Sequence, residues 1–179
     1  MIPELQEIGA LRKVLPYGRY LTTMDELGET TYAPTDNAVR RMIWDAFQEV
    51  TTVVRQAYGK LAATWIGGSF ITSEEEPHDI DVVYLVDESS YSNGISDPRS
   101  QFVTQVLLRR SPITDKLNPL VDAYLFPVPP TTIDNNYNYS AARGYWDQFW
   151  SKTRYKEGNC RWLYPSAGYL EVMIDGYDN

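Results

Sequence analysis

The sequence is poor in cysteine and histidine, with one of each, Cys160 and His78, in 179 residues. A single cysteine excludes an internal disulfide and fits a reducing compartment. No segment reaches the roughly 18 consecutive apolar residues that a membrane-spanning helix requires. The N-terminus lacks a basic region followed by an apolar stretch, so no signal peptide is expected. Together these absences predict a cytoplasmic protein.

Positive charge is also scarce, because 16 Lys and Arg residues stand against 24 Asp and Glu residues, for a net charge of -8. Nucleic-acid backbones are held mainly by clustered Lys and Arg, so this balance weighs against broad nucleic-acid binding. It leaves room for a nucleotide bound through metal ions, whose charge reverses the local electrostatics. Aromatic residues are abundant, with 14 Tyr and 5 Trp, which predicts aromatic surfaces as well as an aromatic core.

The chain has no internal repeat and no linker rich in Gly, Ser or Pro, so we expect a single domain over residues 1–179. Residues 1–34 are predicted to be irregular except for one short helix that begins at Thr23. The remaining pattern predicts helices over 36–60, 99–110 and 140–156, strands over 63–66, 80–86, 119–126, 160–164 and 169–174, and loops over 88–98 and 131–139. This order predicts an α/β or α+β fold in which helices cover a small mixed sheet.

Two aspartates stand at the start of one apolar run, in the segment HDIDVVYLV. Asp79 and Asp81 are two residues apart, and side chains with this spacing on a strand share a face. Like charges side by side raise one pKa unless a cation lies between them. Hard divalent cations such as Mg²⁺ or Mn²⁺ prefer oxygen-rich sites of this kind. The alternative interpretation is that both aspartates are solvated at the strand end. His78, beside them, is either an exposed loop residue or a base.

A third carboxylate, Asp122, is the one charged residue among apolar neighbours in PLVDAYLF. A buried carboxylate without a partner is strongly destabilising, so Asp122 needs a counter-charge. If its strand neighbours the strand of Asp81, the three carboxylates converge and suffice for one or two metal ions. In the alternative, Asp122 lies on an edge strand and faces water.

Gly67, Gly68 and Ser69 follow the preceding apolar run. Glycines let backbone N–H groups approach an anion closely, and the serine hydroxyl adds a hydrogen-bond donor. A phosphate-binding turn would then stand next to metal-binding carboxylates, which suits a nucleoside triphosphate with its metal. An ordinary strand-ending turn is the alternative.

These residues resemble the signature of the DNA polymerase β-like nucleotidyltransferase superfamily in its minimal single-domain form. The signature is a Gly-Ser pair, here Gly68-Ser69, followed by an Asp-x-Asp motif, here Asp79-Ile80-Asp81, with a later strand carboxylate similar in placement to Asp122. The chain also resembles a family of small predicted nucleotidyltransferases of bacteria and phages over 15–27, 67–83, the Asp122 strand and 144–158. In that family the loop before the aspartates often carries a lysine, where this chain has Glu74-Glu75-Glu76.

The resemblance implies a nucleotidyltransferase fold and the Mg²⁺-dependent transfer of a nucleoside monophosphate from ATP or another NTP to an acceptor hydroxyl. Asp79 and Asp81 would bind the metals. Asp122 would complete the second metal site and help to deprotonate the hydroxyl. Gly68 and Ser69 would hold the donor phosphates. The acceptor would be a protein or small molecule, with a tRNA end as a further option, and a role in toxin–antitoxin pairs or phage conflict would fit.

A basic segment follows in the last predicted helix and just beyond it. Its cations include Arg143, Lys152, Arg154 and Lys156, in a chain that is otherwise acidic. Such cations could hold the triphosphate or the phosphates of an acceptor. They could equally form a solvated helix face. A second function of another class is also consistent with the sequence: a non-catalytic module, such as an immunity or antitoxin protein, that keeps the fold and binds a cognate protein partner.

Overall fold

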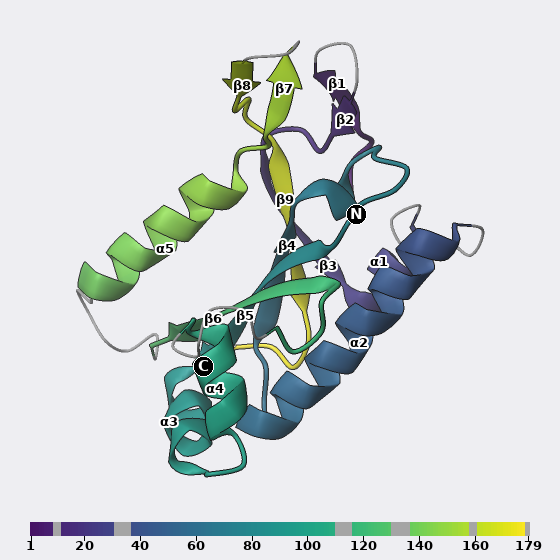
Figure 1. Ribbon diagram of the computed structural model, residues 1–179. Helices are drawn as coiled ribbons and strands as arrows, with labels where there is room; N and C mark the ends of the chain where they lie inside the picture. The colour runs from purple at the N-terminus through teal and green to yellow at the C-terminus, as the bar shows by residue number, and fades with distance from the viewer. Residues whose placement is uncertain (9–11, 31–36, 110–115, 130–136, 158–160, 178–179) are drawn as a thin grey trace.

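The computed structural model describes residues 1–8, 12–30, 37–109, 116–129, 137–157 and 161–177 (Figure 1). Cys160 and most of the predicted loop over 131–139 lie outside these ranges. Among the described residues, no helix is both long enough and apolar enough to cross a lipid bilayer.

A five-stranded mixed sheet forms the centre of the molecule, with the order β3-β9-β4-β5-β6. Its strands are β3 (Gly18–Thr23), β9 (Gly168–Met173), β4 (Ala63–Gly67), β5 (Ile80–Asp87) and β6 (Val121–Val128). The β3–β9 and β5–β6 pairs are parallel, whereas β4 pairs antiparallel with both β9 and β5. The predicted α+β fold with a small mixed sheet is therefore confirmed.

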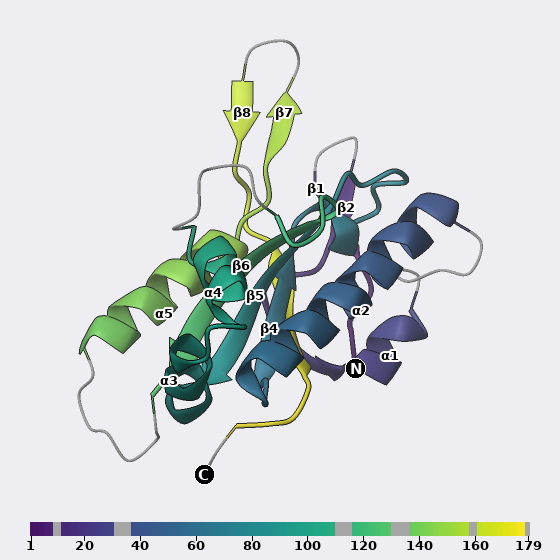
Figure 2. The ribbon, with the colours of Figure 1, turned by 60° about the horizontal axis from the view of Figure 1, so that its bottom comes forward.

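Helices cover both faces of this sheet (Figures 1 and 2). The long helix α2 (Ala38–Tyr58) lies on one face beside the short helix α1 (Met24–Gly28), and α5 (Tyr137–Trp150) lies on the opposite face. The connection from β5 to β6 contains α3 (Glu88–Ser96) and α4 (Gln101–Leu107). Two hairpins, β1–β2 (Gln6–Ile8, Arg12–Val14) and β7–β8 (Tyr155–Glu157, Arg161–Leu163), lie outside the main sheet.

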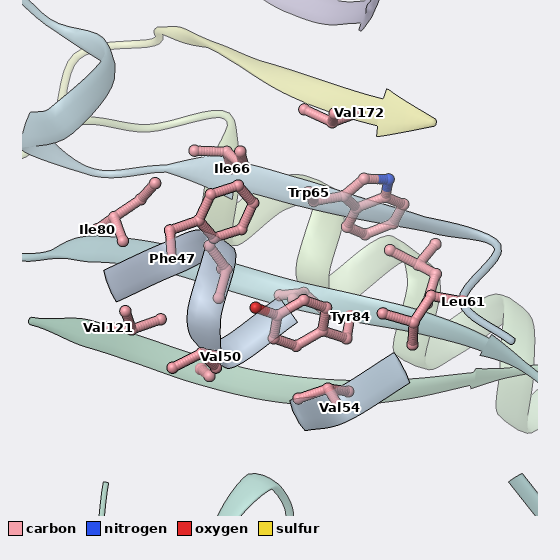
Figure 3. Close-up of a cluster of buried hydrophobic side chains, with 14 of the residues drawn as sticks. Phe47, Val50, Val54, Leu61, Trp65, Ile66, Ile80, Tyr84, Val121 and Val172 are labelled. Carbon is pink, nitrogen blue, oxygen red and sulfur yellow. The ribbon is translucent and has the colours of Figure 1, made fainter. Parts of the chain in front are cut away.

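The main core lies between α2 and the sheet (Figure 3). Phe47, Val50 and Val54 recur at helical spacing, so they share the face of α2 that packs on the strands. In β5 the alternate residues turn to this side, and the Tyr84 hydroxyl lies 2.9 Å from the Thr51 hydroxyl of α2. The intervening residues of β5, Asp81 among them, therefore face α5. The sheet thus separates a packed core from the face that carries the predicted site.

Several elements differ from the sequence-based prediction, among them the hairpin strands β1, β2 and β7, which were not predicted. The segment over 88–98, predicted as a loop from its Ser, Asn and Gly content, contains α3. Packing outweighs its weak helix propensity, because the Tyr91 ring stacks on Tyr58 with centroids 6.4 Å apart. Residues 1–34, predicted to be irregular, contribute β3 to the sheet through long-range pairing with β9. The last helix, predicted to reach Lys156, ends at Trp150.

Candidate functional site

The three predicted carboxylates come together where β5 and β6 begin. Asp81 and Asp122 are direct partners in the parallel β5–β6 register, so their side chains leave the sheet on the same face. Asp79 lies one residue before β5 and is close enough to act electrostatically on Asp81. β6 is both the neighbour of β5 and an edge strand of the sheet, and the Asp122 side chain is 22% exposed, so each of the two alternatives left open by the sequence holds in part.

Burial raises the pKa of Asp81 to about 7, and the negative charges of Asp79 and Asp122 add to the rise. Lys116 and Arg154 oppose it, because their positive charges favour the ionised carboxylate. Close to neutral pH, Asp81 thus holds a proton in part of the molecules. A carboxyl group in this state readily gives up its proton when a cation approaches.

Two cations of the α4–β6 connection already pair with these carboxylates. The Lys116 ammonium lies 3.2 Å from Asp79 Oδ2 and 3.6 Å from Asp122 Oδ1. Arg109 pairs with Asp122 Oδ1, and its guanidinium also lies 4.5 Å from the centre of the Tyr124 ring. The Tyr124 hydroxyl donates to Asp122 Oδ2 over 3.2 Å. These contacts fix the Asp122 carboxylate and place an ammonium group between two acids.

The donor set suits a hard divalent cation in its chemistry, since three carboxylates supply oxygen ligands. Within the described part of the chain, however, no group of three or more His, Cys, Asp or Glu side chains is already gathered as a metal site. The Lys116 ammonium lies within 4 Å of Asp79 and of Asp122, so a metal ion held by Asp79, Asp81 and Asp122 would have to take the place of this ammonium.

The Gly-Ser turn lies directly against the acids. Gly67 is the antiparallel partner of Asp81, and Ser69 begins the one-turn 3₁₀ helix η1 (Ser69–Ile71). Gly68 has φ of +73°, and a Cβ atom on it would lie 1.7 Å from Asp81 Oδ2. Only a glycine therefore lets the turn approach the carboxylate so closely. Ser69 is half-buried beside an exposed Gly68, so this turn reaches solvent at the edge of the acid cluster.

Arg40 of α2 holds the chain that follows this turn. Its side chain is 5% exposed and donates to the backbone carbonyls of Phe70 over 2.7 Å, Thr72 over 2.9 Å, and Glu74. Arg40 falls between the apolar positions of the helical pattern, yet its side chain is buried. Nothing in the sequence distinguishes it from the neighbouring, exposed Arg41, because the carbonyls that it binds are 30 to 34 residues away.

The aromatic face of α5 closes one side of the site. The Trp150 ring packs on Gly67, where an added Cβ would lie 2.0 Å from it. Trp146 stacks on Trp150 with centroids 6.3 Å apart and packs against Tyr124 at 5.1 Å. Tyr124 in turn contacts Asp122. An aromatic wall thus runs from the Gly-Ser turn to the third carboxylate.

The predicted cations of the C-terminal part are divided between different places. Arg154 is exposed, and its charge acts to lower the pKa of Asp81, so it lies within electrostatic reach of that carboxylate. Arg143 instead donates to the Tyr139 hydroxyl over 2.6 Å and lies 5.5 Å from the Trp65 ring centre. Lys152 is exposed beyond α5, and Lys156 lies on β7 with its side chain outside the described part. His78 is an exposed loop residue.

Lys116 and Arg109 were not identified from the sequence. Both belong to the connection LLRRSPITDKLN over 107–118, which carries no motif. Their role depends on the parallel β5–β6 register, which brings that connection back to the acids. Only the tertiary structure reveals it.

The fold and the site define a small α+β protein with three carboxylates, two counter-cations and a Gly-Ser turn at one end of a mixed sheet. Residues 10–173 match a family described as "Family of unknown function (DUF6932)", and the chain belongs to this family. The match spans all five strands of the main sheet and the whole acid cluster. No curated protein matches the chain, and no solved structure matches it.

Proposed function

We propose that this protein is a metal-dependent nucleotidyltransferase, which moves a nucleoside monophosphate from an NTP to an acceptor hydroxyl. One observation carries the proposal: Asp81 and Asp122 are paired on adjacent parallel strands, with Asp79 beside them and Gly68 in contact with Asp81. The three carboxylates can bind the metal of a nucleoside triphosphate, and the exposed Gly-Ser turn beside them can bind its phosphates.

A Mg²⁺ or Mn²⁺ ion held by Asp79, Asp81 and Asp122 would neutralise the donor phosphates and stabilise the charge that develops during transfer. Gly68 and Ser69 donate hydrogen bonds to the β- and γ-phosphates, and Arg154 adds a positive charge near them. Arg109 and Tyr124 orient the Asp122 carboxylate, which accepts the proton of the attacking hydroxyl. The new bond joins the hydroxyl oxygen to the α-phosphorus. The bond to the bridging oxygen breaks, and pyrophosphate leaves.

The net charge of -8 favours a protein or a small molecule as acceptor over a large RNA. A tRNA end stays among the acceptors to be tested, because Arg154 and Lys152 give the C-terminal side of the site positive charge. A cytoplasmic setting, in a toxin–antitoxin pair or in phage conflict, fits such a reaction.

Transfer is tested with NTPs labelled at the α-phosphate, in the presence of Mg²⁺ or Mn²⁺ and a cell extract as the source of acceptors. We expect labelled product from the wild-type protein and a decrease of about 10³-fold or more in Asp79→Ala, because the donor would lose a metal ligand. Asp45→Ala, which removes an exposed carboxylate from α2, serves as the charge-matched control. Undiminished transfer by folded Asp79→Ala would contradict the assignment.

The second candidate function is a non-catalytic module that binds a protein partner. It is favoured by the ion pairs of Lys116 and Arg109, which already compensate the acids, and by the exposed Tyr145 and Phe149 rings on α5. A thermal-shift scan distinguishes the two. An enzyme is expected to gain several degrees in melting temperature with metal and a non-hydrolysable NTP together. A binding module is expected to show no change.

A further inference from the structure

The Lys116 ammonium lies between two of the three acids. It pairs with Asp79 at 3.2 Å and with Asp122 at 3.6 Å, and its charge also lowers the pKa of Asp81. The side chains of Lys116 and Asp79 are each 31% exposed, and that of Asp122 is 22% exposed. Water and small ions therefore reach the group.

The charges of the cluster are close to balance without any metal. Lys116 and Arg109 pair with the carboxylates, and the charge of Arg154 also acts on Asp81, so three cations stand against three acids. A divalent ion entering this group would leave it with excess positive charge. One of the cations that contact the carboxylates must then give up its place.

Lys116 is the cation that can move. Arg109 is fixed by its ion pair with Asp122 and by the face of the Tyr124 ring, 4.5 Å away. Lys116 has no such second anchor in the described structure, and a lysine ammonium sits on a flexible stem whose donors rotate freely. At 3.6 Å its contact with Asp122 is also longer than a hydrogen bond.

We propose that Lys116 is an internal counter-ion that competes with a divalent metal for Asp79 and Asp122. The displaced ammonium is stable only when it finds another anion, and the phosphates of the donor nucleotide supply one. Metal and nucleotide therefore bind together: either alone binds weakly, and each strengthens the binding of the other. This inference rests on the proposed function and adds that metal and nucleotide bind cooperatively at the site.

The test measures Mn²⁺ binding directly, by electron paramagnetic resonance of the free ion, with and without a non-hydrolysable NTP. In the wild-type protein we expect the nucleotide to tighten Mn²⁺ binding by about tenfold or more, within the usual range of coupling between sites. Lys116→Met keeps the length of the side chain and removes its charge. We expect it to bind Mn²⁺ alone about tenfold more tightly than the wild type, and to lose most of the coupling.

Lys60→Met is the matched control, because the Lys60 side chain is also 31% exposed and its ammonium lies 3.5 Å from Asp87, at the opposite end of β5. It should leave Mn²⁺ binding unchanged. Lys116→Gln, a second neutral variant, should behave as Lys116→Met does. A lysine with a purely structural role would lower the melting temperature on substitution without tightening metal binding.

The outcomes separate the two proposals. Mn²⁺ binding that Asp81→Asn abolishes but that Lys116→Met leaves at the wild-type affinity would overturn the counter-ion role and keep the metal site. Absence of Mn²⁺ binding in the wild type and in both Lys116 variants, even with nucleotide, would overturn the metal site and the competition together.

Discussion

Asp81→Asn is expected to make the protein more stable at pH 8 while it abolishes nucleotidyl transfer. The pKa of Asp81 rises from 3.8 to about 7 on folding, mainly through burial. An asparagine has nearly the same shape and carries no charge into the site. The full shift corresponds to a ceiling of about 4 kcal/mol, and the burial of the asparagine amide reduces the expected gain to about 2 kcal/mol.

The gain depends on pH in a defined direction. Below about pH 4 the carboxyl group is protonated in both the folded and the unfolded chain, so Asp81 costs nothing. Between about pH 4 and pH 7 only the unfolded chain releases the proton, so the wild type loses stability as the pH rises. Above about pH 7 both states are ionised and the penalty stays constant. The difference between Asp81→Asn and the wild type should therefore grow up to neutral pH and then level off.

Urea denaturation at pH 5 and pH 8 measures this difference, and the labelled-NTP assay measures transfer on the same samples. Asp45→Asn, in which an exposed carboxylate of α2 is removed, controls for net charge and should show no comparable trend. A difference in stability that is constant across pH would show that the ionised Asp81 is fully compensated in the fold. Retained transfer by Asp81→Asn would remove this residue from the proposed chemistry.

Gly68→Ala is expected to lower the free energy of unfolding by about 3 kcal/mol and to abolish transfer. The residue has φ of +73° and ψ of -165°, a region that is essentially restricted to glycine. The new methyl group would also lie 1.7 Å from Asp81 Oδ2, so either the turn or the carboxylate must move. Both movements separate the Gly-Ser turn from the acids.

Substitutions at two other glycines distinguish the cost of the backbone conformation from the cost of the steric clash with Asp81. Gly59 has φ of +76° with nothing within 4 Å of an added Cβ, so Gly59→Ala should show the backbone cost alone, about 1 kcal/mol. Gly144 lies inside α5 with equally open surroundings, and Gly144→Ala should be stabilising by about 0.5–1 kcal/mol. If Gly68→Ala destabilises the protein no more than Gly59→Ala does, the predicted clash between the new methyl group and Asp81 would be contradicted.

The sequence predicted those parts of the fold that depend on local pattern. The amphipathic spacing of Phe47, Val50 and Val54 identified α2, and short apolar runs located β4, β5 and β6 within two residues. The Asp79–Asp81 spacing and the lone charge in the Asp122 strand were enough to foresee that three carboxylates could meet. The unknown was whether the strands are neighbours, which the β5–β6 register resolves.

The remaining features depend on partners that lie far along the chain. β3 becomes a strand because β9 pairs with it about 150 residues later. Arg40 looks like a surface residue until the carbonyls of the turn after Ser69 surround it. The role of Lys116 depends on the fold, which brings its connection next to Asp79. In each case the neighbouring residues in the sequence do not indicate the long-range contact.

The position of β9 also affects how the sheet forms during synthesis. This strand, residues 168–173, lies between β3 and β4, so β3 is joined to the rest of the sheet by the strand that is synthesised last. The β4–β5–β6 part of the sheet can form while translation continues, but β3 stays without its neighbour until residues 168–173 have left the ribosome. A nascent chain halted before residue 168 would therefore present the unpaired edge of β4 to chaperones.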